Sequence, residues 1–251
     1  MNRVVRASIV AVLLVVACSC GRTGTRAPAG SDATASARSS STVESAPAAT
    51  YDAAPAGTRP RIVFLGDSLT AGLGLDRDES VPALIQTHLD KAGYKYEVVN
   101  AGVSGDTSAG GLSRLDWSLQ GDVRILVLEL GANDGLRGLP VENTRKNLDE
   151  IIHRAQSRGI AVLLTGMEAL PQYGPTYTAQ FHAIYPDLAM QDHVVFMPFY
   201  LDGVAGNPEL NQADGIHPNP AGARIVEAHM WEALQPMLDR AMGPARRGGG
   251  S

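Results

Sequence analysis

The sequence predicts an α/β fold, a three-layer α/β/α arrangement around a central parallel sheet. Short apolar runs alternate with longer segments of helical periodicity. Most of the short runs are nearly continuous in apolar residues, which is typical of strands covered on both faces. Alternating strands and helices favour right-handed crossover connections. We expect five strands, at residues 61–65, 96–100, 124–130, 161–166 and 194–199.

Four amphipathic segments are predicted to be the principal helices. Ser80 can cap the first of them, Pro82 lies in its first turn, and Gly93 ends it. The other three have apolar residues at helical spacing over 141–155, 181–188 and 225–234. A further helix is expected to begin at Ser68, directly after the first strand.

Composition limits the possible function. The chain has 251 residues, of which 44% are apolar and 19% charged, and its formal net charge is -5. These values suit a globular protein, and without a basic block nucleic-acid binding has little support. The two cysteines, Cys18 and Cys20, both precede the predicted domain. Inside the domain the sequence therefore excludes disulfides and cysteine-based metal sites.

The first 17 residues have the pattern of a secretion signal. Arg3 and Arg6 precede a mainly apolar segment, 7–17, which is too short to cross a hydrocarbon core of about 30 Å as a helix. The sequence VVAC, ending at Cys18, resembles the lipobox of bacterial lipoproteins. That resemblance implies a lipid on Cys18 and a membrane-anchored protein on the periplasmic side of the bacterial cell envelope, with Ser19 compatible with the outer membrane. The alternative is an ordinary signal peptide with two incidental cysteines.

Residues 18–60 are expected to be a disordered tether. Of the 40 residues from 21 to 60, 31 are Ala, Ser, Thr, Gly or Pro, and such a segment buries too little apolar surface to offset its ordering entropy. The tail 243–251 is interpreted in the same way. Residues 61–242 remain for one domain, which is long enough for a sizeable core. We expect this domain to be monomeric.

Small and polar residues gather after the predicted strands. The segments are GDSLTAG at 66–72, NAGVSGDT at 100–107, GANDG at 131–135 and DGIHPN at 214–219. Because functional groups collect beyond the carboxyl ends of parallel strands, we expect these four segments to lie together. A loop that only reverses the chain does not need Ser, Asn, Asp and His together.

These segments contain the residues of a serine hydrolase. Ser68 needs a base to accept its proton, and His217 is the candidate base. Asp214, three residues earlier, can bind the other imidazole nitrogen and stabilise the imidazolium. Candidate donors to an oxyanion are the backbone N–H groups of Ser68 and Gly105 and the side-chain amide of Asn133.

The four segments resemble the four sequence blocks of the SGNH, or GDSL, hydrolases, and the match extends over residues 61–240. It is greatest with the bacterial branch of multifunctional acyl-CoA thioesterase I, lysophospholipase and arylesterase. The family implies a flavodoxin-like fold with a five-stranded parallel sheet. It also implies hydrolysis of esters and thioesters through an acyl-serine, without metal or other cofactor. By this resemblance Ser68, Asp214 and His217 are the catalytic triad, and Ser68, Gly105 and Asn133 form the oxyanion hole.

The resemblance also implies where an acyl ester or lipid substrate binds. Segment 134–139 corresponds to a mobile loop that closes over acyl chains, and segment 169–171 lines the acyl groove. Glu168 and Ala169 differ from the family pattern, so the preferred chain length is not predicted. Asp67, Asp106 and Asp134 are expected to shape turns through hydrogen bonds. The residues expected to contact substrate are Leu69, Asp134, Gly135, Leu136, Leu170, Pro171 and Tyr173.

Two other functions fit parts of the sequence. A carbohydrate O-acetylesterase of the same superfamily would use the same residues but act on acetyl groups. A non-catalytic envelope lipoprotein could bind phosphate at the helix start after the first strand. That interpretation lacks the glycine-rich phosphate motifs and leaves Asp214 and His217 without a role. The sequence therefore favours a serine esterase acting on aryl and acyl esters, thioesters or lysophospholipids.

Overall fold

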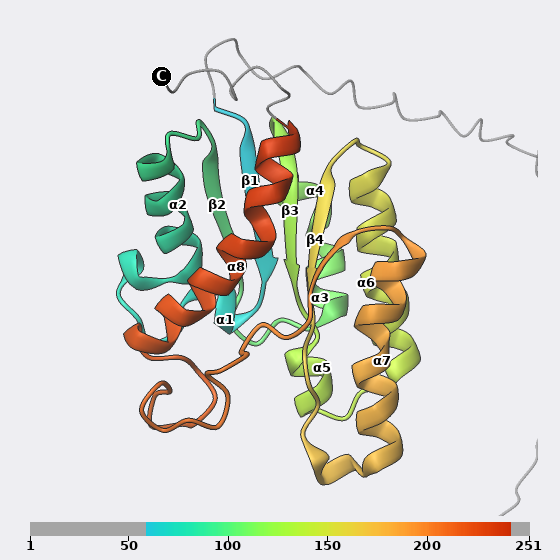
Figure 1. Ribbon diagram of the computed structural model, residues 1–251. Helices are drawn as coiled ribbons and strands as arrows, with labels where there is room; N and C mark the ends of the chain where they lie inside the picture. The colour runs from blue at the N-terminus through green and yellow to red at the C-terminus, as the bar shows by residue number, and fades with distance from the viewer. Residues whose placement is uncertain (1–58, 242–251) are drawn as a thin grey trace, which may run out of the picture. The chain divides into compact units, whose positions relative to one another are not determined.

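The computed structural model describes residues 59–241, whose five strands form one parallel sheet. The strand order is β2-β1-β3-β4-β5, so the chain moves to one side of β1 and then crosses to the other (Figure 1). This is the predicted α/β fold. The strands are β1 (Arg61–Gly66), β2 (Glu97–Gly102), β3 (Val123–Glu129), β4 (Ala161–Thr165) and β5 (Val195–Met197).

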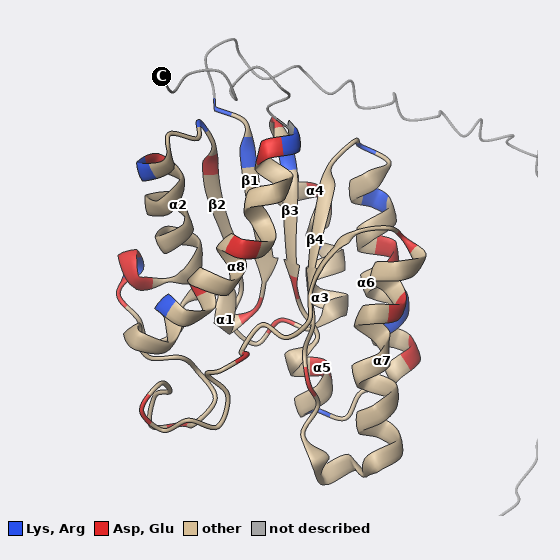
Figure 2. Cartoon of the chain, viewed as in Figure 1, with Lys and Arg blue, Asp and Glu red and all other residues tan. Residues whose placement is uncertain are grey.

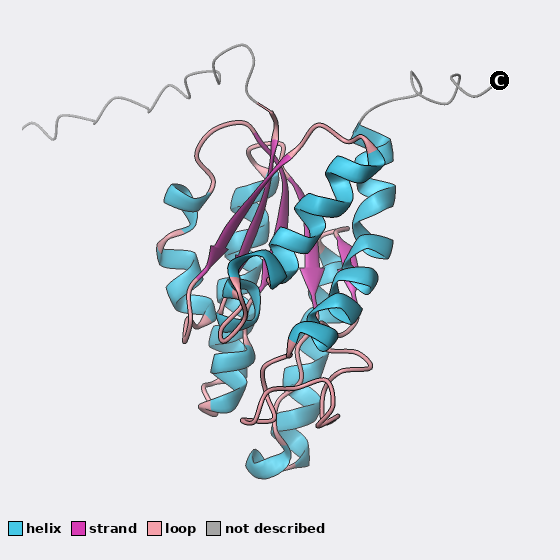
Figure 3. Ribbon diagram, turned by 90° about the vertical axis from the view of Figure 1, so that its left-hand side faces the viewer, coloured by secondary structure: helices cyan, strands magenta, loops and turns pink. Residues whose placement is uncertain are grey.

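Helices cover both faces of the sheet, as the edge-on view shows (Figure 3). On one face α2 (Val81–Ala92) packs against α8 (Pro220–Ala241). On the other face α6 (Val141–Gln156) packs against both α3 (Ser108–Ser113) and α7 (Pro175–Gln191). The remaining short elements are α1 (Ser68–Ala71), α4 (Leu115–Ser118), α5 (Ala132–Leu136) and the 3-10 turns η1 (Arg77–Glu79) and η2 (Pro171–Tyr173).

The helix termini differ from the sequence prediction at α2, α7 and α8, and α8 extends beyond the predicted stripe 225–234 at both ends. Ser80 precedes α2 as expected, but its side chain makes no capping bond and donates instead to the carbonyl of Arg77. Ser80 therefore occupies the predicted N-cap position without the side-chain capping bond, since a cap must accept an N–H of the first turn and this hydroxyl is turned toward Arg77. Helix α7 begins at Pro175, well before its first core residue, Phe181. Proline can start a helix because the first N–H has no intrahelical acceptor.

The core lies on both faces of the two central strands. Residues Ile62–Leu65 of β1 and Leu126–Leu128 of β3 have no exposed surface. Strands buried on both faces require an uninterrupted apolar run, which explains why these segments do not alternate with polar residues. The loops at the carboxyl ends of β1 and β3 therefore start from a rigid base.

Several predicted segments lie outside the described residues. The signal segment 1–17, the lipidation site Cys18, most of the tether 18–60 and the tail 243–251 belong to this group. Between residues 59 and 241, no helix combines the length and apolar character needed to cross a membrane.

Candidate active site

Strands β1, β2 and β3 end at the same edge of the sheet, so the polar segments that follow them begin close together. Gly66, the last residue of β1, pairs with Gly102 of β2 and with Glu129 of β3. The segments that follow these strands therefore start side by side, and Figure 1 shows α1, α5 and the loop before α8 at this edge. Acidic positions occur at the carboxyl ends of β1 and β3 (Figure 2).

Ser68 is the first residue of α1, a helix of one turn. The Asp67 carboxylate caps this helix by accepting the N–H of Leu69 at 3.0 Å. The helix ends at Gly72, which has a left-handed conformation with φ of 77°. The first N–H groups of a helix have no intrahelical acceptor. The sharp turn thus presents both the hydroxyl and the N–H of Ser68 at the edge of the sheet.

A hydrogen-bonded chain links Ser68, His217 and Asp214. The Oγ of Ser68 lies 2.8 Å from Nε2 of His217, although the two residues are 149 positions apart. The Nδ1 of the same imidazole lies 2.7 Å from Oδ2 of Asp214. With Nδ1–H donating to the carboxylate, Nε2 is free to accept the serine proton. The structure therefore brings together the three side chains that the sequence analysis selected as nucleophile, base and acid.

The local backbone keeps Asp214 ionised. Its Oδ1 accepts the backbone N–H groups of Ile216 and His217, at 2.9 and 3.0 Å. These bonds, followed by the bond to the imidazole, lower the pKa of Asp214 to about 2. Hydrogen bonds to a carboxylate favour its charged form. The group is thus an anion at neutral pH and can stabilise an imidazolium at His217.

Three N–H donors are available for an oxyanion. Within residues 59–241, the backbone N–H groups of Ser68 and Gly105 donate to no acceptor. Asn133, on α5, donates one amide hydrogen to Oδ2 of Asp67 at 2.9 Å and has a second hydrogen to offer. Gly105 lies in the exposed loop after β2 with φ of +83°. These are the groups that the sequence analysis selected as oxyanion donors.

Asp67 shapes the nucleophile turn, as predicted, and it is completely buried. Burial raises its pKa from 3.8 to about 6, against the opposing effect of the bonds from Leu69 and Asn133. Beneath this turn lies a second buried carboxyl group, that of Glu129. Sequence analysis did not single out Glu129, because it lies within the run expected to form the third strand.

Sequence analysis also missed Arg114, which ties the strand ends to the loop of Gly105. Its Nε donates to Oδ2 of Asp106 at 2.7 Å, Nη1 donates to the carbonyl of Ala101 at 2.7 Å, and Nη2 to that of Gly66 at 2.9 Å. Asp106, adjacent to Gly105, therefore shapes its loop by hydrogen bonding, as predicted. No motif signals the role of Arg114, since its partners come from two separate segments, 66–72 and 100–107.

The predicted substrate contacts fall into two groups. Leu69, which is 7% exposed, lines a small pocket together with Ser68, Leu73 and His217. On the other side of the edge, Leu170 and Tyr173 are each 42% exposed, and Pro171 is exposed. The Tyr173 hydroxyl donates to the carbonyl of half-buried Leu136 at 2.9 Å. Leu136, in the predicted acyl-binding segment 134–139, is therefore held by Tyr173, which lies two residues beyond segment 169–171.

Two residues of segment 134–139 have packing roles. The Asp134 side chain is buried and accepts bonds from the N–H of Ser108 and the hydroxyls of Ser108 and Thr144. The Asp134 carboxylate therefore has its hydrogen-bond partners inside the domain, as its expected turn-shaping role requires, and its contact with substrate stays a prediction. Gly135 is buried beside Phe181 and Ala169.

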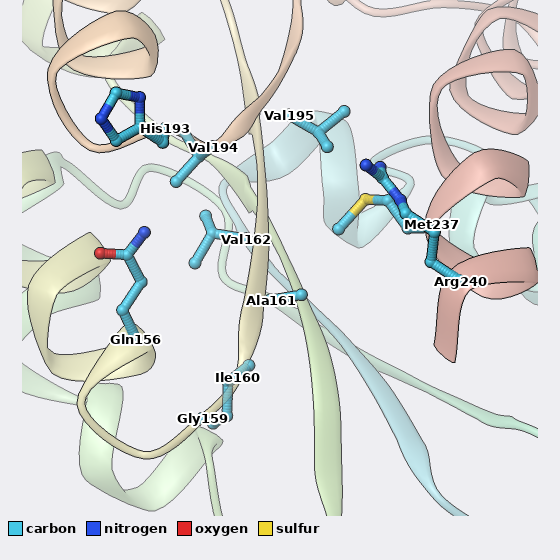
Figure 4. Close-up of a pocket in the computed structure, with 10 residues that line it drawn as sticks. All are labelled: Gln156, Gly159, Ile160, Ala161, Val162, His193, Val194, Val195, Met237 and Arg240. Carbon is cyan, nitrogen blue, oxygen red and sulfur yellow. The ribbon is translucent and has the colours of Figure 1, made fainter. Parts of the chain in front are cut away.

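A larger hollow of about 640 Å³ lies at the opposite end of the sheet (Figure 4). It opens near the amino end of β4 and contains no serine or carboxylate that could act as a nucleophile. The predicted catalytic residues lie at the carboxyl end of the sheet, and we assign the active site to that end. The lining residues come from the end of α6, the starts of β4 and β5, and α8: Gln156, Gly159–Val162, His193–Val195, Met237 and Arg240.

Three curated relatives are esterases by name. Esterase TesA of Pseudomonas aeruginosa is 43% identical, with 70% of this chain and 89% of the relative aligned. An arylesterase of Vibrio mimicus is 40% identical, covering 69% and 84%. The "Thioesterase 1/protease 1/lysophospholipase L1" of Escherichia coli is 39% identical, covering 71% and 85%.

Solved structures have the same fold. The crystal structure of TesA is 41% identical and superposes with a TM-score of 0.67 over 70% of this chain and 99% of that chain. The psychrotrophic esterase EstA from Pseudoalteromonas sp., in a structure inhibited by monoethylphosphonate, is 33% identical with a TM-score of 0.68, covering 71% and 98%. A family model matches residues 64–225, which contain every candidate catalytic residue, and the chain belongs to the GDSL-like lipase/acylhydrolase family.

Proposed function

We propose that the protein is a serine esterase that hydrolyses carboxylic esters through an acyl-enzyme on Ser68. The observation that carries this proposal is the 2.8 Å contact between Oγ of Ser68 and Nε2 of His217. A serine hydroxyl becomes an effective nucleophile when an adjacent base accepts its proton. His217 has the required orientation because Asp214 holds its Nδ1.

The reaction proceeds in two halves. In the first, Oγ of Ser68 attacks the ester carbonyl carbon and its proton passes to Nε2 of His217. The N–H groups of Ser68 and Gly105 and the amide of Asn133 stabilise the negative oxygen. The imidazolium then protonates the leaving alcohol, phenol or thiol as the bond breaks. In the second half, water attacks the acyl group with His217 as base, and Ser68 recovers its proton as the acid leaves.

We infer that the substrates are aryl esters, acyl thioesters and lysophospholipids. The names of the three curated relatives support this breadth. So do the apolar side chains beside the candidate site, since Leu73 and Leu170 are 47% and 42% exposed. Their partial exposure leaves apolar surface for an acyl chain or an aromatic ring to cover.

The Ser68→Ala variant tests the proposal with p-nitrophenyl esters of increasing acyl length. We expect kcat to fall by a factor of at least about 10³, because the residual acceleration then comes from the oxyanion donors and binding alone. Ser157→Ala is the matched control: it removes an exposed hydroxyl at the end of α6 and should retain wild-type turnover. Wild-type activity in Ser68→Ala would refute the proposed mechanism.

We also propose that the domain is a monomer anchored to the bacterial cell envelope by a lipid on Cys18. The VVAC sequence and the small, polar composition of residues 21–60 support an anchor followed by a tether. In the producing cell, the wild-type chain should fractionate with membranes and Cys18→Ser should be released. Equal membrane association of both proteins would contradict the anchor, and sedimentation of the released form as a dimer would contradict the monomer.

A further inference from the structure

A buried carboxyl group contacts the turn of Ser68 from below. Glu129 ends β3 and has no exposed surface. Its Oε2 accepts the backbone N–H of Asp67 at 3.2 Å and the hydroxyl of Thr70 at 2.7 Å. One donor immediately precedes Ser68 and the other follows it by two residues. Both hydrogen bonds therefore fix the short segment whose conformation aims the Ser68 hydroxyl.

The packing around Glu129 leaves room for its carboxyl group and for little else. Gly66 pairs with Glu129 in the sheet. A Cβ added to Gly66 would lie 2.5 Å from Oε2 of Glu129 and would also overlap Oγ1 of Thr70. A side chain at position 66 would displace one of these groups. The absence of a side chain at Gly66 is what lets the carboxyl group reach the nucleophile turn.

Two buried carboxyl groups meet at this turn, and their surroundings differ. Asp67 accepts N–H bonds on both oxygens, from Leu69 and from Asn133. Glu129 uses Oε2 alone, and its buried Oε1 has no hydrogen-bond partner within residues 59–241. Two adjacent carboxyl groups in one buried site cannot both be ionised at low cost. The negative charge therefore belongs on Asp67, and the proton on Glu129.

The two phenols near Glu129 add no charge that opposes this distribution. Tyr185 and Tyr200 are buried, and burial raises the pKa of each phenol well above its ordinary value. Two charges act on Asp67: His217 favours its ionised form, and Asp106 disfavours it with a smaller effect. Burial, followed by the charge of Asp67, also holds the pKa of Glu129 well above its ordinary range.

We propose that Glu129 is a positioning residue that holds the Ser68 turn as a neutral carboxylic acid and leaves the negative charge to Asp67. Asp67 then keeps its charge-assisted bond to Asn133, one of the proposed oxyanion donors. This inference rests on the proposed esterase function. It adds a requirement that the triad alone does not impose, namely that the group beneath the nucleophile accepts two hydrogen bonds without carrying charge.

Glu129→Gln and Glu129→Leu separate hydrogen bonding from charge. The Gln side chain is neutral and its carbonyl can accept both bonds, so we expect kcat within about threefold of wild type. The Leu side chain can accept neither, so kcat should fall by a factor of about 30 or more while KM changes by less than about threefold. Wild-type turnover in Glu129→Leu would overturn the inference. So would a loss in Glu129→Gln as large as in Glu129→Leu, because it would mean that an ionised carboxylate is required.

Infrared difference spectra of wild type against Glu129→Gln at neutral pH report the proton directly. The expected result is a protonated carboxyl C=O band that the variant lacks, and a carboxylate band in its place would overturn the inference. If Ser68→Ala kept its activity, the proposed function would fail. If Ser68→Ala were inactive and the Glu129 results went against expectation, this inference alone would fail.

Thr70 provides a second test that keeps Glu129 in place, should Glu129→Leu not fold. Thr70→Val removes the hydroxyl that donates to Glu129, and we expect kcat to fall about three- to tenfold, with Thr70→Ser restoring it. Thr165→Val is the matched control. Thr165 is a buried threonine at the end of β4, and its hydroxyl donates to the carbonyl of Leu128 on β3. This control should lower stability to a similar extent without changing kcat. Unchanged kcat in Thr70→Val would overturn the inference.

Discussion

The amide of Asn133 has two hydrogens, and within residues 59–241 one of them is held by Asp67. This bond fixes the orientation of the amide, so its second hydrogen can serve a developing oxyanion without reorganisation. Preorganised donors of this kind act on the transition state more than on the ground state. The value of Asn133 to the reaction therefore depends on a neighbour that does not touch substrate.

Asn133→Ala should lower kcat by a factor of about 10²–10³, equivalent to about 2.7–4 kcal/mol, with little change in KM. Steady-state kinetics on a soluble p-nitrophenyl ester measure both constants. Asn143→Ala, at an exposed position near the start of α6, is the control and should match wild type. An increase in KM at unchanged kcat would assign Asn133 to substrate binding and contradict the oxyanion role.

At this scale the sequence could predict residues that occur in motifs at strand ends, such as Ser68 and His217. It could not predict Glu129 or Arg114. Glu129 lies in a run whose pattern indicates only a strand, and it contacts residues 62 and 59 positions away. Arg114 lies in a stretch for which the sequence predicts no element, and its contact with the last residue of β1 joins residues 48 positions apart. Asp134 shows the converse limit, because a residue inside a functional motif can direct its side chain into the core.

Among the elements, α1 depends on how closely β2 approaches it. A Cβ on Gly102 would overlap the backbone N of Ala71 and lie 2.7 Å from its Cα. Backbone atoms cannot rotate away as a side chain can. The helix that carries Ser68 therefore has its position set by a residue without a side chain on the neighbouring strand.

Gly102→Ala should displace α1, lowering kcat at least tenfold and destabilising the fold by about 1–3 kcal/mol. Gly159→Ala provides the comparison: its φ is +72° and nothing lies near the added Cβ. It should cost about 1 kcal/mol through backbone strain alone and leave kcat unchanged. Urea unfolding and steady-state kinetics on both variants give the comparison, and equal kcat in the two would rule out the coupling between β2 and α1.

The inner strands β1, β3 and β4 could be predicted from apolar runs because both of their faces are buried. The edge strands β2 and β5 are mostly half-buried, and they could be predicted because they too contain apolar runs. The principal helices could be predicted from their apolar stripes, to within a few residues at most ends. The short helices α3, α4 and α5 could not, since one or two turns are too short to show a stripe. Their conformation depends on tertiary bonds, such as those that Ser108 donates to the Asp134 carboxylate.

For the whole molecule, the buried Asp67 makes stability depend on pH. Its pKa is about 6 in the folded state and 3.8 ordinarily. Between these values the folded state binds more protons than the unfolded state, so the contribution of Asp67 to the free energy of unfolding falls as pH rises. Function therefore has a cost in stability, because the charge that orients Asn133 is held in a buried site.

Asp67→Asn removes this titration. The free energy of unfolding of wild type minus that of the variant should decrease by about 1–3 kcal/mol between about pH 4 and pH 6.5, then level off. Urea titrations of both proteins across this range measure the difference. A constant difference, or one that increases with pH, would show that Asp67 is not held at a raised pKa.

The most direct test of the central claim is the site at which a fluorophosphonate reacts with the full chain, determined by intact mass and peptide mapping. Our account predicts one adduct per chain, on Ser68, absent from Ser68→Ala and formed at least about 10² times more slowly in His217→Ala. Labelling at another residue, or an undiminished rate in His217→Ala, would contradict the claim that His217 activates Ser68.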